Sequence, residues 1–139
     1  MAQATFTKYG HTWKAGVALW DLERYMIKQG RDLFTHYKAL HRILWPDHSE
    51  HKWTDLVLRE FTDCVEKRGR GMVGLIGPAS TGKTYNAAKF ALSHYYVYPE
   101  ETTILLTTTT VQKLDLNIFA EVKSMHKAAK ERFPELPGR

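Results

Sequence analysis

The chain has 139 residues, of which 43% are hydrophobic and 25% charged, and its formal net charge is +5. This composition is typical of a globular domain and excludes a disordered or fibrous protein. The single cysteine excludes an internal disulfide framework and a zinc site built from several cysteines.

Residues 1–71 predict a helical N-terminal region that follows an irregular lead-in over residues 1–16. An apolar pattern without Gly or Pro indicates a helix over residues 17–29. Asp32 opens a second helix, which Pro46 ends. We expect a third helix over residues 53–65, because the glycines that follow are a natural C-terminal stop.

Residues 72–139 have a different pattern. The short apolar run 72–76 is typical of a buried parallel strand, and a helix is expected from about residue 82 to 95. A second buried strand is expected over residues 102–108. Thr109 and Gln112 have the spacing of a capping box before a final helix over residues 114–133. This order predicts an α/β fold with a parallel sheet.

Residues 77–84 match the pattern G-x-x-x-x-G-K-[ST] between the first expected strand and its helix. In such a loop the backbone N–H groups bind phosphate, helped by the positive N-terminus of the helix. The sequence therefore predicts an ATP site made of Gly77, Pro78, Ala79, Ser80, Thr81, Gly82, Lys83 and Thr84. We expect Lys83 to be the catalytic cation at the β- and γ-phosphates and the Thr84 hydroxyl to bind Mg²⁺. The alternative is a glycine-rich turn with an incidental lysine.

ATP hydrolysis also needs an acidic group for Mg²⁺ and a group that orients water. The usual place is the end of an apolar strand, but the strand expected at 102–108 ends in threonines. Asp115, Glu121 and Glu131 fall in the final helical pattern instead. We therefore expect this chain alone to be inactive or weakly active as an ATPase.

Three stretches resemble the ATPase region of tailed-phage terminase large subunits, which are DNA-packaging motors. They are residues 77–88, with the phosphate-binding loop, residues 103–110, with four threonines after an apolar run, and residues 129–138, which close the last helix. The upstream stretch with Trp53 and residues 58–61 is also similar. The likeness covers roughly residues 40–139.

This resemblance implies a DNA-packaging ATPase that moves double-stranded DNA into a procapsid. It implies a P-loop NTPase with a RecA-like parallel sheet, of which residues 72–139 would be the first, incomplete half. It also implies a small terminase subunit and a portal as partners, and a homo-oligomer in the full motor. Two alternatives stay open: another P-loop ATPase, such as a helicase or an AAA-type loader, and a nucleotide- or DNA-binding module that does not hydrolyse ATP.

Several other features have two interpretations. Lys123, Lys127 and Lys130 share one side of the last expected helix, where they either contact DNA phosphates or form an ordinary solvated face. The histidines at 41, 48 and 51 are expected to be solvated rather than metal ligands. Trp45 or Trp53 either packs in the core, which we favour, or contacts adenine.

No run approaches the roughly 18 apolar residues of a membrane span, and the N-terminus lacks a signal-peptide pattern. We therefore expect a cytoplasmic protein without membrane partners.

Overall fold

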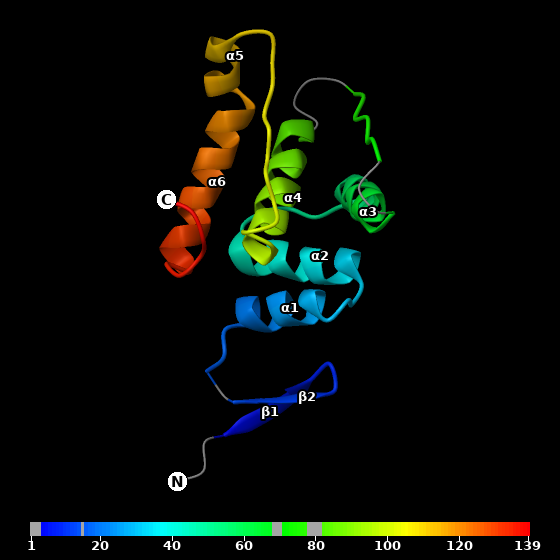
Figure 1. Cartoon of the computed structure of the whole chain (residues 1–139), viewed down its shortest axis with the longest axis vertical. Helices are drawn as coiled ribbons and strands as arrows, with labels where there is room; N and C mark the ends of the chain where they lie inside the picture. Colours follow the sequence, from blue (N-terminus) through cyan, green and yellow to red (C-terminus); the bar gives the residue numbers. More distant parts are fainter. Residues whose placement is uncertain (1–3, 15, 68–70, 78–81) are drawn as a thin grey trace.

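The computed structural model describes residues 4–14, 16–67, 71–77 and 82–139 of the chain. Within these residues it is mostly helical, with one small antiparallel sheet (Figure 1). The strands are β1 (Thr5–Lys8) and β2 (His11–Lys14). The helices are α1 (Leu19–Lys28), α2 (Leu33–Leu44), α3 (Lys52–Glu66), α4 (Lys83–Val97), α5 (Val111–Leu116) and α6 (Ile118–Arg132).

The prediction of a parallel sheet is wrong. Residues 72–76 and 102–108 are extended, but neither pairs with a strand in the described part of the chain, where β1 and β2 form the only sheet. Met72 and Ile76 are each 97% exposed and Leu105 is 84% exposed. An apolar, β-rich run becomes a strand only when neighbouring strands bind its backbone, and the described residues supply no such neighbour. The RecA-like α/β assignment is therefore corrected to a helical fold with a hairpin.

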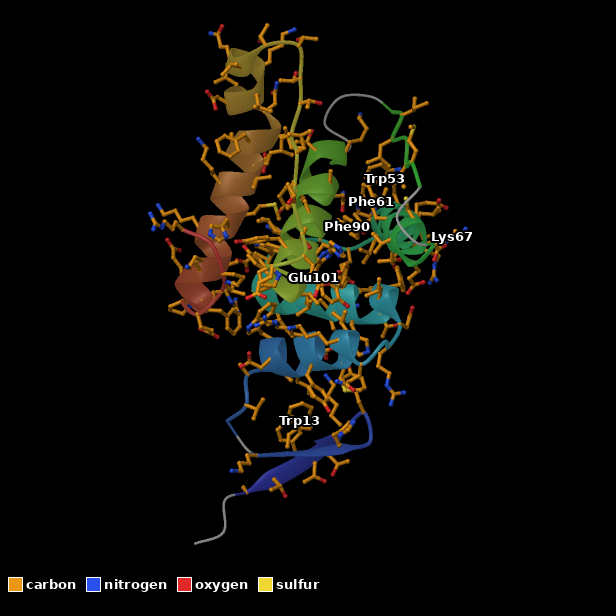
Figure 2. All side chains as sticks on the ribbon, in the orientation of Figure 1. Trp13, Trp53, Phe61, Lys67, Phe90 and Glu101 are labelled. Atoms are coloured by element: carbon orange, nitrogen blue, oxygen red, sulfur yellow. The ribbon has the colours of Figure 1, made fainter. Side chains whose placement is uncertain are left out.

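Helix α4 lies at the centre of the helical assembly. It contacts α1, α2, α3 and α6, and Figure 1 shows it between α3 and α6. Its C-terminal half provides Leu92, Tyr96 and Val97 to a core that also contains Trp20 and Tyr37 from the N-terminal helices. On the side of α3, the rings of Phe61 and Phe90 stack with centroids 4.8 Å apart (Figure 2). Burial of these large apolar side chains fixes the position of α4.

Most helix boundaries follow from local sequence signals. The Asp32 side chain accepts a hydrogen bond from the Thr35 N–H and caps α2, and the helix ends before Pro46, as expected. The final helix differs from the prediction, because it breaks at Asn117 into α5 and α6. The capping residue is Thr110, which accepts from the Lys113 N–H, rather than Thr109.

Residues 5–14 form a hairpin instead of the expected irregular lead-in. Its turn residues Tyr9 and Gly10 both have positive φ, 55° and 74°, as the type I′ form of a two-residue hairpin turn requires. The strands pair Phe6 with Trp13, and Figure 2 shows the Trp13 ring between the hairpin and α1. There it meets the ring of Tyr25 edge to face, with centroids 5.3 Å apart.

A buried carboxylate attaches this hairpin to the helices. Glu23 on α1 is fully buried and accepts hydrogen bonds from Lys8 Nζ at 2.8 Å and from the Tyr9 hydroxyl at 2.7 Å. It also pairs with the ring of His36 on α2. Burial opposes ionisation of Glu23, but these partners lower its pKa below the usual value. The ionised carboxylate therefore joins the hairpin, α1 and α2.

We predict that Glu23→Gln lowers the free energy of unfolding by about 1.5–3 kcal/mol, the contribution of hydrogen bonds to a charged group. The amide cannot accept from all three partners or balance the charge of Lys8. Urea unfolding followed by circular dichroism measures the change. The exposed carboxylate of Glu100 provides the control, since Glu100→Gln changes the same atoms without a buried network. Equal stability of the two variants would contradict the assigned role of Glu23.

Candidate phosphate-binding site and adjoining cavity

The start of α4 coincides with the second glycine of the sequence motif. Gly82 is the residue before the first helical turn and has φ +80°, in the left-handed region that favours glycine. The Asn86 side chain donates to the Gly82 carbonyl at 2.7 Å, and the Asn86 N–H donates to it at 2.9 Å. No acidic residue lies in the first turn. The positive end of α4 is therefore not neutralised by its own side chains.

The structure places four of the eight predicted loop residues. Lys83 Nζ donates to the Gly77 carbonyl at 2.7 Å, so the two ends of the motif lie together. Thr84, the expected Mg²⁺ ligand, is exposed in the first turn of α4. Pro78, Ala79, Ser80 and Thr81 lie outside the described residues. The glycine backbone, the lysine and the hydroxyl fit a phosphate group and its cation in residue type.

A cavity of about 280 Å³ lies beside α4, one to two helical turns after the motif. It is enclosed by α2, the loop after it, α3 and α4. Its lining residues are Lys38, His41, Arg42, Trp45, Pro46, His48, Glu50, Thr54, Asp55, Leu58, Asn86 and Lys89. Asn86 thus contacts both the Gly82 carbonyl and this cavity.

Ion pairs neutralise two of the cations at the cavity wall. Arg42 binds Glu50 through two hydrogen bonds, of 2.6 and 2.7 Å, and lowers the pKa of that carboxyl. Lys38 Nζ lies 2.8 Å from Asp55 and 3.8 Å from Glu50. These side chains form a fixed charged rim.

Lys89 differs from these cations. Its residue is only 4% exposed, yet it has no carboxylate within 4 Å in the described part of the chain. Its ammonium instead lies 5.4 Å from the ring centre of Tyr85. Burial lowers the pKa of Lys89, and the charge of Glu50 opposes this only in part. A buried cation without an ion pair is unfavourable for folding and is typical of a ligand site.

Two histidines at the cavity also have incomplete hydrogen bonding. Nε2 of His41 and Nδ1 of His48 are buried without a partner among the described residues. Nε2 of His48 is hydrogen-bonded to the Tyr85 hydroxyl of α4. The expectation of solvated histidines is therefore wrong for His41 and His48, which α4 partly covers, whereas His51 is exposed as expected.

The loop after α2 connects α6 to the start of α4. Trp45 is 3% exposed and its indole N–H donates to the Met125 carbonyl of α6 at 2.9 Å. The rings of Trp45 and His48 are parallel within 5°. His48 in turn contacts Tyr85, the residue after Thr84, with ring centroids 4.4 Å apart. Trp45 therefore belongs to the core and also lines the cavity, whereas Trp53 lines a groove between α3 and residues 72–76.

Of the cavity residues, the sequence singled out Trp45, for core packing or an adenine contact, and His41 and His48, but not Asn86 or Lys89. Asn86 and Lys89 are one helical turn apart and follow Gly82 by four and seven residues, so they extend from the motif along one face of α4. This polar face on a mostly apolar helix was the sequence signal that could have indicated the cavity. The sequence also gave no sign that Glu121 of α6 acts on Tyr85. Burial, and after it the negative charge of Glu121, raises the pKa of Tyr85 to about 12.

Comparisons with protein-family models, with curated proteins and with solved structures gave no match. The likeness to terminase large subunits rests on the sequence stretches quoted above. No group of three His, Cys, Asp or Glu suited to hold a metal occurs within the described ranges. None of the described helices is long and apolar enough to cross a membrane.

We predict that acid destabilises the protein through His41. Burial, with the charge of Lys89 adding to it, lowers the pKa of His41 from 6.5 to about 3. Between these values the unfolded chain binds a proton that the folded chain does not, so stability is complete above pH 6.5 and falls as the pH drops toward 3. One such proton gives a slope of about 1.4 kcal/mol per pH unit.

Urea unfolding from pH 4 to 7 measures this slope, and His41→Gln should reduce it by about one proton. The partly buried histidines 48, 94 and 126, whose pKa values are also lowered, keep part of the slope. His11→Gln is the control, because His11 is exposed on the hairpin. If His41→Gln and His11→Gln have the same effect on the slope, the explanation is wrong.

Proposed function

We propose that this chain binds ATP with Mg²⁺ through residues 77–84 and is the ATP-binding part of a motor that packages double-stranded DNA into a phage procapsid. The observation that carries the nucleotide proposal is the start of α4: a left-handed glycine, a lysine and a threonine in motif order at an unneutralised helix N-terminus. Helix N-termini of this kind bind phosphate. The motor, its portal and small-subunit partners, its oligomer and its place in the host cytoplasm are carried by the resemblance alone.

In this proposal each residue has one role. Gly77 and Gly82 leave room for phosphate oxygens beside the backbone, and Lys83 exchanges the Gly77 carbonyl for the β- and γ-phosphates. The Thr84 hydroxyl is the oxygen ligand of Mg²⁺, which neutralises phosphate charge when bound. Hydrolysis needs a further acid, which we assign to a longer protein that includes this chain. The chain alone should therefore hydrolyse ATP slowly.

We predict that Lys83→Ala weakens ATP binding about tenfold or more, because a charge-assisted contact to phosphate is lost. Isothermal titration calorimetry with MgATP measures the affinity. Lys67→Ala, at the exposed C-terminal end of α3 and labelled in Figure 2, removes the same charge away from the site. Equal affinities for Lys83→Ala and Lys67→Ala would remove the phosphate-loop assignment.

The cavity beside α4 is the place we propose for the nucleotide base. Lys89 follows Lys83 by six residues, about 9 Å along the helix axis, so the base would lie one ribose and its phosphates away from the loop. The flat ring of Trp45 and the unpartnered nitrogens Nε2 of His41 and Nδ1 of His48 suit a flat group with polar edges, and the Lys89 ammonium lies at the same cavity without an ion pair among the described residues. The volume of about 280 Å³ lies near the lower end of known ligand pockets.

We predict opposite effects of Lys89→Met on stability and binding. Methionine fills a similar volume without a buried charge, so the free energy of unfolding should rise by about 1 kcal/mol. ATP should bind several-fold more weakly, while inorganic tripolyphosphate, which has no base, should bind as to the parent protein. Thermal unfolding and calorimetry measure the two quantities, with Lys67→Met as control. A loss of stability, or an equal loss for both ligands, would contradict the base site.

A further inference from the structure

An open groove of about 410 Å³ lies along α6 and the C-terminal residue. Figure 1 shows α6 on the opposite side of α4 from α3. The groove is lined by Lys123, His126, Lys127, Lys130, Glu131 and Arg139, and is called the α6 groove below. Four of these six side chains carry a positive charge and one carries a negative charge. The three lysines are spaced by four and three residues, so they lie on one face of the helix.

The chain end completes this groove. After α6 the tail folds back, and Lys130 Nζ donates to the Gly138 carbonyl at 2.7 Å. Gly138 has φ +94°, and a Cβ on it would lie 3.1 Å from Cε1 of His126. Glycine at this position thus allows the tail to lie against His126 and brings Arg139 to the lysines.

The cations of the α6 groove are not neutralised by the protein. None of them forms an ion pair within 4 Å with a carboxylate of the described residues, whose ion pairs all lie between positions 8 and 55. Lys123 Nζ lies over the ring of Phe119, at 4.6 Å from its centre. The Lys130 charge also adds to the lowering of the His126 pKa that burial causes. The groove therefore has a positive field directed at solvent.

We infer that the α6 groove binds the sugar-phosphate backbone of duplex DNA, without reading its sequence. Lys123 and Lys130 are separated by about 10 Å along the helix axis, a straight row that suits a regular phosphate backbone. No Phe, Tyr or Trp lines the groove. Sites for single strands usually stack bases on such rings, so the duplex is favoured. The inference rests on the DNA partner of the proposed function but not on ATP binding.

Fluorescence anisotropy with a labelled 20-base-pair duplex between 50 and 200 mM KCl tests this inference. Lys123→Ala/Lys127→Ala should weaken binding about 60-fold at 100 mM salt and reduce the salt slope by about 1.8, the value for two phosphate contacts. The matched control is Lys28→Ala/Lys67→Ala, which removes two exposed lysines from α1 and α3. Similar losses in the two double variants, or no DNA binding by the parent, would overturn the inference.

Two further variants change the groove without removing a lysine. Glu131→Gln should strengthen DNA binding several-fold, because it removes the carboxylate of the groove. Gly138→Ala should weaken it by displacing the tail with Arg139. A single strand of the same length should bind more weakly than the duplex; equal or tighter binding overturns the preference for duplex DNA.

ATP binding to the same variants separates this inference from the proposed function. The double variant of the α6 groove should bind MgATP like the parent protein, while Lys83→Ala should keep its affinity for the duplex. If the parent protein binds no ATP but binds DNA through the α6 groove, only the nucleotide site is rejected. The converse result rejects the α6 groove alone.

Discussion

The packing of α4 against α1, α2, α3 and α6 is the constraint on which the rest of the structure depends. Tyr96 and Val97 near its C-terminus are completely buried, and the tyrosine ring meets Trp20 edge to face. A helix held in this way cannot shift without opening the core, since interiors are close-packed. Core packing therefore holds the N-terminus of α4 at Gly82 in place, together with the motif residues in its first turn.

Local signals in the sequence were sufficient for most helices but not for the strands. Asp32 and Pro46 set the two ends of α2 through interactions within a few residues, so both ends could be predicted from the sequence. The hairpin was missed because Tyr9 takes a left-handed turn conformation that usually calls for Asn or Gly. Residues 72–76 have strand-like composition, but strand formation depends on a distant backbone partner that composition does not reveal.

The candidate site divides in the same way. Gly77, Gly82, Lys83 and Thr84 could be identified because their chemistry lies in one short motif at a helix start. The cavity could not, since His41 and His48 meet Lys89 only after α2, α3 and α4 have packed. The buried, unpaired state of Lys89 is likewise a property of the fold: the sequence shows a lysine in a helix, for which exposure is the ordinary expectation.

The extended residues 71–77 give the molecule an uneven local stability. Their backbone forms no ladder with any described segment, whereas the helix that begins at Gly82 is anchored in the core. Amide hydrogens of 72–76 should therefore exchange with solvent far faster than those of α4. Residues 77–84 connect the extended segment to the anchored helix α4. A ligand that binds the motif and orders residues 72–76 would slow the amide exchange of these residues without contacting them. Hydrogen exchange of residues 72–76 can therefore detect a ligand bound at the motif.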